Sequence, residues 1–162
     1  MITLLVISTV AALALLVLSV SEAGGVPASL SATYYEMDGD GWLFQLLLAA
    51  TSASLLPVWL TNSTPGHEWM AFLACASLMF VASAPAFRLE LQGKVHYTAA
   101  ALCCVCAAWW QIAEGVWDTL LFLSFIALAL VIRDRSKWCW WLECAVTGSV
   151  YLNLIRETIV KL

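Results

Sequence analysis

The chain has 162 residues, of which 63% are hydrophobic and only 11% are charged, and its mean hydropathy is +0.91. Soluble domains carry about 25% charged residues, so this composition predicts an integral membrane protein. The net charge is −4, with only seven Lys and Arg residues. So few basic side chains exclude a surface that neutralises several phosphates, and we expect no nucleic-acid partner.

Apolar runs separated by short polar segments predict an all-α fold, with residues 1–162 forming a single bundle of six transmembrane helices. The first run covers residues 2–20. At about 1.5 Å per residue this is long enough to cross about 30 Å of hydrocarbon. The other predicted spans follow at residues 42–60, 69–86, 95–113, 116–132 and 138–155.

The longest polar interruption is the segment 22–41, which we call the cap. It carries four acids, two adjacent tyrosines and no basic residue. With six spans, the connections after spans one, three and five lie on one face of the membrane. His96 opens the fourth span on that face, so we expect the cap to be an ordered lid close to His96.

The basic residues divide unequally between the two faces. Five of them share the face of the cap, and the other two lie on the face of the termini; they are Arg88, Lys94, Arg133, Arg135 and Lys137 against Arg156 and Lys161. Basic residues in short loops are enriched on the cytoplasmic side, so this count predicts a cytoplasmic cap.

One set of candidate ligand-binding residues combines the cap with the sixth span. Glu143 lies about 8 Å into that span by helical rise, and an ionisable group at such depth usually faces the bundle interior. Trp140, Glu143 and Tyr151 recur on one helical stripe, which either lines a pocket or only joins helices. The candidates are Tyr34, Tyr35, Glu36, Asp38, His96, Trp140, Glu143 and Tyr151.

A second set consists of acids that could relay protons or bind a cation. Glu114 and Asp118 flank the tight turn between spans four and five, and Glu143 is the acid inside span six. The alternative is an acidic turn at the membrane interface, because carboxylates near a helix start are favoured by the helix dipole.

Several chemistries lack the residues that they need. A catalytic zinc site generally takes three protein ligands, and the only two histidines, His67 and His96, are expected on opposite faces, so we predict no metal site. All six cysteines lie in apolar runs, where they are expected to pack between helices. Ser29 or Ser31 could work with His96 as a hydrolase, but the G-x-S-x-G signature is missing. No cofactor is expected.

Two short stretches resemble the six-helix family of the damage-regulated autophagy modulator proteins and related bacterial membrane proteins of unknown function. One is Pro27-Ala28-Ser29-Leu30-Ser31, after the first span. The other is Phe87, followed by His96-Tyr97-Thr98-Ala99-Ala100. The family has an acid after the serine and Gln after the phenylalanine, where this chain has Ala32 and Arg88. The resemblance implies a cap outside the cytosol and a role around lipids or trafficking.

From these features we expect a non-enzymatic membrane protein that binds a lipid or a small hydrophobic ligand between helices under the cap. Membrane lipids are the expected partners. Small residues in the fourth span allow close helix approach, and the same face could join two copies in a homo-oligomer. Two alternatives stay open, namely a small proton-coupled or solute transporter and a lipid-modifying enzyme.

Overall fold

The computed structural model describes residues 1–37, 39–85 and 89–161. In these ranges every regular element is helical, which confirms the all-α prediction. The elements are α1 (Ile2–Glu22), the 3-10 turn η1 (Leu30–Ala32), α2 (Thr33–Glu36), α3 (Gly41–Asn62), α4 (Glu68–Ser83), α5 (Glu90–Ala113), α6 (Trp117–Arg133), the 3-10 turn η2 (Arg135–Lys137) and α7 (Trp138–Val160).

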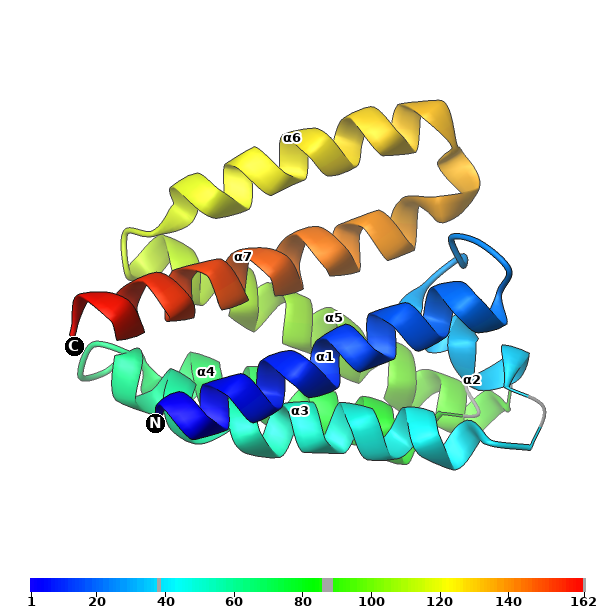
Figure 1. The fold of residues 1–162 in the computed structure, drawn as a ribbon, viewed down its shortest axis with the longest axis horizontal. Coiled ribbons are helices and arrows are strands. Elements are labelled where there is room, and N and C mark those ends of the chain that lie inside the picture. The colour runs from blue at the N-terminus through cyan, green and yellow to red at the C-terminus, as the bar shows by residue number, and fades with distance from the viewer. Residues whose placement is uncertain (38, 86–88, 162) are drawn as a thin grey trace.

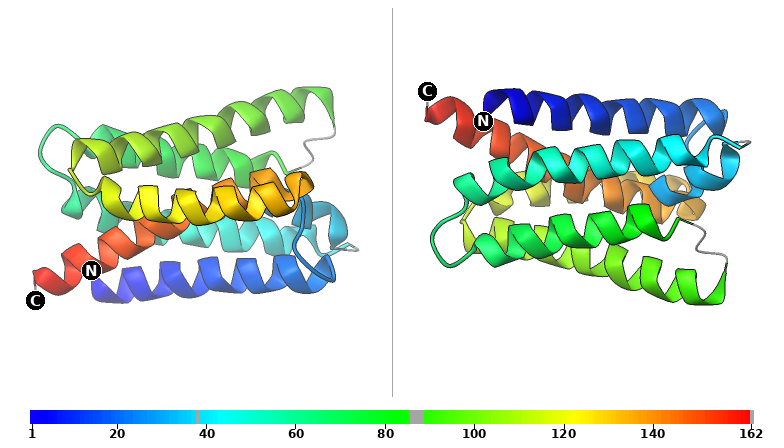
Figure 2. Two further views of the ribbon diagram at one scale, coloured as in Figure 1. Left: turned by 90° about the horizontal axis from the view of Figure 1, so that it is seen from above. Right: turned by 90° about the horizontal axis from the view of Figure 1, so that it is seen from below.

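The long helices lie side by side and alternate in direction (Figure 1). Both termini, the α3–α4 loop and the α5–α6 turn lie at one end of the bundle. The cap, with η1 and α2, lies at the other end, where the α6–α7 turn also lies (Figures 1 and 2). Helices α1, α3, α4 and α5 pack in sequence, each on the next, and α7 touches α1, α3 and α5. Helix α6 packs mainly on α7, so it is the peripheral helix of the bundle.

Among the described residues, three helices are long and apolar enough to cross a membrane: α1, α3 and α5. Helix α4 is apolar but has only 16 residues. The structure therefore supports three of the six predicted spans by length and composition.

Some helix ends differ from the predicted ones. Helix α4 ends at Ser83 rather than at residue 86, because Pro85 disfavours the helical conformation at Ala84. Helix α5 begins at Glu90 rather than at residue 95, and an ion pair of 2.9 Å between Lys94 and Glu90 lies on its first turns. Helix α7 continues to Val160 rather than ending at 155. Charged residues that were predicted to be loop are therefore helical.

The distribution of polarity is the reverse of that in a soluble protein. Inside the bundle, several polar side chains are fully or almost fully buried, including Ser8, Ser52, Gln111 and Asn153. Large apolar side chains cover the outside; Val17 and Phe125 are each 69% exposed. The buried polar groups join helices: Ser52 donates to the carbonyl of Cys75 at 2.7 Å, and Asn153 donates to the Gln111 side chain at 3.0 Å.

The cap is a folded segment rather than a plain loop. Ser29 begins η1, since its hydroxyl accepts a hydrogen bond of 3.2 Å from the N–H of Ala32. Tyr34 on α2 packs edge-on against Phe44 of α3, with ring centroids 6.3 Å apart. The same ring covers Gly41, where an added Cβ would lie 2.5 Å from a ring carbon. A side chain at the first residue of α3 would therefore collide with the Tyr34 ring, and glycine avoids this contact.

Candidate functional site

The turn η1 fastens the cap to two helices through neighbouring residues. The backbone N–H of Leu30 donates to Oε2 of Glu143 on α7 at 2.7 Å. The Ser31 hydroxyl and Nε2 of His96 on α5 are 2.9 Å apart. The N–H of Trp140 also donates to the carbonyl of Ala28 at 3.3 Å. The cap is thus held on both α5 and α7.

His96 is buried, with only 2% of its surface exposed, and its ring has a defined orientation. Its Nδ1 lies 2.9 Å from the carbonyl oxygen of Ala84. Because a carbonyl oxygen only accepts hydrogen bonds, Nδ1 carries the proton, and in the neutral ring Nε2 accepts the hydrogen of Ser31. This is the order of bonds in a serine–histidine pair. However, Ser31 is itself only 7% exposed.

A cavity of about 190 Å³ lies below the cap, between α1, α3 and α7, and Leu30 of the cap forms its roof. Its walls are mostly apolar and include Leu15, Leu30 and Leu48. The polar side chains in its wall include Glu143, Thr51 and Tyr151. Leu30 of the cap and Glu143 both line the cavity, and the Leu30 N–H donates to Glu143. This one hydrogen bond therefore joins the roof of the cavity to the acid in its wall.

Glu143 has acceptor capacity that its contacts do not use. The Cys139 thiol donates to it, in addition to the N–H of Leu30. A carboxylate offers about four acceptor positions, and a thiol is a weak donor. Across residues 1–37, 39–85 and 89–161, no Lys, Arg or His side chain forms an ion pair with Glu143. Among the described residues, the acid in the cavity wall therefore has no cationic partner.

The deep end of the cavity has a hydroxyl without a partner. Tyr151 bonds both the hydroxyl and the carbonyl of Ser8 on α1, and the Ser8 hydroxyl donates to the carbonyl of Thr51 at 3.0 Å. Thr51 is 4% exposed, and within the described part of the chain its Oγ1 has no hydrogen-bond partner. The cavity thus has Glu143 near the cap, and it has Thr51 and Tyr151 near its other end.

The predicted candidates of the cap lie elsewhere. Tyr34 and Tyr35 pack against each other, with ring centroids 5.3 Å apart, and Glu36 is exposed on α2. None of these three is among the residues that line the cavity. Asp38 falls outside the described residues. Trp140 is buried, and its contact with the cap is through its backbone.

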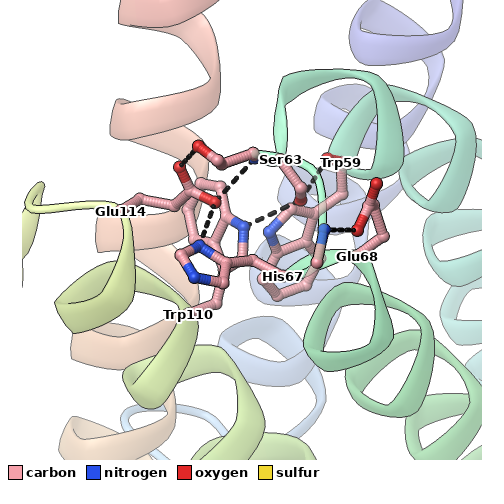
Figure 3. Close-up of polar contacts among 8 residues, drawn as sticks. Trp59, Ser63, His67, Glu68, Trp110 and Glu114 are labelled. Carbon is pink, nitrogen blue, oxygen red and sulfur yellow. Dashed lines mark hydrogen bonds and ion pairs between the residues drawn. The ribbon is translucent and has the colours of Figure 1, made fainter.

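The second polar centre is at the opposite end of the bundle, around Glu114 (Figure 3). Its carboxylate accepts hydrogen bonds from the N–H of Thr64 at 2.8 Å and from the Thr64 hydroxyl at 2.7 Å. The third partner is Nδ1 of His67 at 3.1 Å. Trp110 adds a bond of 2.8 Å from its Nε1 to the hydroxyl of Ser63. This cluster clamps the α3–α4 loop onto the end of α5.

Burial of Glu114 opposes its ionisation, but the Thr64 hydroxyl and N–H and the His67 ring outweigh that effect and lower the pKa of Glu114. Asp118 has a different partner, Arg156 on α7, at 3.5 Å, and both side chains are largely exposed. Glu114 and Asp118 therefore have separate partners, and Glu143 belongs to the other end of the bundle.

Two polar contacts have no counterpart in the sequence-based set. The pair of Gln111 and Asn153 is fully buried, and each residue lies inside an apolar run. Amide side chains inside apolar runs indicate hydrogen bonds between helices, because a membrane helix rarely carries them without a partner. The contact of Glu114 with Thr64 and His67 joins loops far apart in sequence, and no local pattern indicates it. In the described residues, no group of three or more His, Cys, Asp or Glu side chains is arranged to hold a metal ion.

Comparison of the chain with protein families, with curated proteins and with solved structures gives no match in any of the three.

Proposed function

We propose that the chain is a multi-pass membrane protein whose six long helices all cross the bilayer. The apolar outside and the polar interior of the bundle support this proposal, since lipid-facing polar side chains are costly. The lengths of α1, α3 and α5 support it as well. The 16 residues of α4 and the 17 of α6 are near the lower limit for a span, which is about 17 residues.

In this bundle, the function that we infer is the binding of one hydrophobic chain of a lipid, or of a small hydrophobic molecule, in the cavity under the cap. The observation that carries it is the cavity itself, with apolar walls and a few polar groups. That combination is typical of small-molecule sites. The role around lipids implied by the resemblance to the damage-regulated autophagy modulator family agrees with this proposal and stays a prediction.

The size of the cavity limits the ligand. An engineered cavity of about 150 Å³ accepts benzene, so about 190 Å³ holds a short stretch of alkyl chain rather than a whole lipid. Leu13 on α1 and Thr147 on α7 line the cavity and are also exposed. The remainder of the ligand therefore leaves sideways between α1 and α7, toward the lipid.

A lipid-modifying enzyme based on Ser31 and His96 has less support. The two side chains have the hydrogen bond of a nucleophile and its base, but both are buried. Leu30, and not Ser31, lines the cavity. We therefore assign this pair to anchoring the cap. A relay through Glu114, Asp118 and Glu143 has less support as well, because the three acids have separate partners at two ends of the bundle.

The binding proposal is tested by filling the cavity. Ala12 lines it and Ala14 is exposed on the same helix, so Ala12→Phe and Ala14→Phe form a matched pair. Thr147→Phe fills the cavity from α7 in case Ala12→Phe does not fold. The purified chain in nanodiscs is titrated with dodecanol, and thermal unfolding is followed by circular dichroism.

We expect dodecanol to raise the Tm of the wild type and of Ala14→Phe, since a ligand that binds only the folded state stabilises it. Ala12→Phe and Thr147→Phe should lose this increase. An unchanged Tm of the wild type at saturating dodecanol, or an equal increase in all four proteins, contradicts a binding role for the cavity.

A further inference from the structure

The carboxyl group of Glu143 is placed where the polar end of a ligand in the cavity would lie. It is in the wall of the cavity, and its Oε2 is fixed by the N–H of Leu30 at the cap end. This backbone bond orients the side chain without neutralising it. The geometry therefore presents a pre-oriented acceptor to whatever occupies the cavity.

We propose that the occupant is a single-chain lipid with a primary ammonium group, which binds Glu143 while its alkyl chain fills the apolar part of the cavity. This inference rests on the proposed function and deepens it by naming the ligand class. The ammonium group supplies the cation that the described residues do not provide, and its three N–H groups use the free acceptor positions of the carboxylate.

Charge and hydrogen bonding decide against other headgroups. Glu143 is half-buried in a mostly apolar wall, where a carboxylate without a cation is costly, and a partner that brings a positive charge removes most of that cost. A fatty acid would place a second carboxyl group beside the first and repel it. An alcohol offers one O–H group and no charge. A quaternary ammonium has the charge, but it has no N–H to donate.

Two chains or a large headgroup do not fit the space. The cavity of about 190 Å³ is only slightly larger than one that takes benzene, so a second chain has no room beside the first. The Thr51 hydroxyl, unpaired within the described ranges, offers a second polar contact at the deep end. The Thr51 hydroxyl is thus an alternative contact for the headgroup. The experiment distinguishes it from Glu143 by replacing each residue in turn.

The test compares ligands with the same chain. Binding of dodecylamine, dodecanol, dodecanoic acid and dodecyltrimethylammonium to the full chain in nanodiscs is measured by displacement of a fluorescent alkyl probe. The variants are Glu143→Gln, Thr51→Val and, as the matched control on the same helix, Glu157→Gln. Glutamine retains an acceptor for the N–H of Leu30, so Glu143→Gln is expected to fold, and its thermal unfolding curve checks this.

We expect the wild type to bind dodecylamine at least about tenfold more tightly than dodecanol, which corresponds to about 1.4 kcal/mol. Dodecyltrimethylammonium should bind less tightly than dodecylamine, and dodecanoic acid most weakly. Glu143→Gln should lower the affinity for dodecylamine to that for dodecanol. The affinity for dodecanol itself should change less than about threefold. Thr51→Val and Glu157→Gln should keep the preference for the amine.

The inference is overturned if the wild type binds dodecylamine and dodecanol with equal affinity. It is also overturned if dodecyltrimethylammonium binds as tightly as dodecylamine. The inference is also wrong if Thr51→Val, and not Glu143→Gln, removes the preference. In these cases the cavity still binds chains, provided that Ala12→Phe abolishes binding. If the wild type binds none of the four compounds, the proposed function fails together with the inference.

Discussion

Replacing Glu114 by alanine tests the clamp between the α3–α4 loop and the end of α5. The substitution removes all three acceptor contacts, with Thr64 N–H at 2.8 Å, the Thr64 hydroxyl at 2.7 Å and His67 at 3.1 Å. A hydrogen bond to a charged group contributes about 1.5–3 kcal/mol. Two of the contacts come from Thr64, and the third is the longest and involves His67, whose side chain is one-third exposed. The contributions of the three contacts to stability are therefore not additive. We expect a loss of about 3 kcal/mol in the free energy of unfolding.

The assay is equilibrium unfolding of the purified chain in mixed micelles with increasing sodium dodecyl sulfate, followed by circular dichroism. The matched control is Glu90→Ala. Glu90 forms only an exposed contact with Lys94 one turn along α5, and such pairs contribute about 0.3–0.5 kcal/mol. If Glu114→Ala unfolds within about 0.5 kcal/mol of the wild type, or loses no more than Glu90→Ala, the cluster is not a clamp.

The lowered pKa of Glu114 gives the same prediction a pH dependence. A group whose pKa is lower in the folded state stabilises the fold fully above its ordinary pKa, which is 4.5 for this residue. This stabilisation is lost as the pH falls through the depressed value. The difference in stability between wild type and Glu114→Ala should therefore be constant near neutral pH and shrink below about pH 4.5. A difference that grows on acidification would refute the reasoning.

Two further substitutions test the other buried contacts. Ser31→Ala removes the hydroxyl that bonds Nε2 of His96 and should cost about 1–3 kcal/mol, with faster amide hydrogen exchange over residues 29–36. Unchanged exchange relative to the exposed control Ser21→Ala would contradict the anchoring role. Asn153→Ala removes the donor to Gln111 and to the carbonyl of Val116 and should cost about 2–3 kcal/mol in the same micelle assay. A cost as small as that of Asn62→Ala, at the end of the bundle, would show that the buried amide pair does not stabilise it.

The positions of the helices were predictable from the sequence because apolar runs and polar interruptions alternate along it. The ends were less predictable where charged residues continue a helix. Lys94 and Glu90 pair within one turn, so the first turns of α5 are helical although they are polar. At the end of α4 the opposite holds, since Pro85 ends an apolar helix early.

The neighbourhood of His96 illustrates how far sequence reasoning extends into the candidate site. Alternation of the spans predicts that the cap and His96 share one end of the bundle, and Ser31 lies within hydrogen-bond distance of that histidine. The partner of Glu143 was not predictable in the same way. It is a backbone N–H, which every residue except proline carries, so no side-chain pattern indicates it.

Glu114 shows a different limit. Its closeness to Asp118 in the chain suggested a shared acidic site, but Gly115 lies between them with φ of +74° and turns the chain sharply. Each acid then bonds what the fold brings next to it, Thr64 and His67 in one case and Arg156 in the other. Partners of this kind depend on which loops meet at one end of the bundle, and that is a property of the packing.

The cap contacts also bear on how the proposed ligand would reach the cavity. Leu30 and Ser31 are adjacent, yet they bind helices on two sides, α7 through Glu143 and α5 through His96. Lifting the roof away from the cavity therefore breaks both contacts together, each made by groups that are costly to leave unpaired. Passage between α1 and α7 breaks neither of them, because the two helices touch at few points and the cavity wall includes exposed residues of both. Under the proposed binding function, we expect a chain that enters from the lipid between α1 and α7 to reach Glu143 with the cap closed.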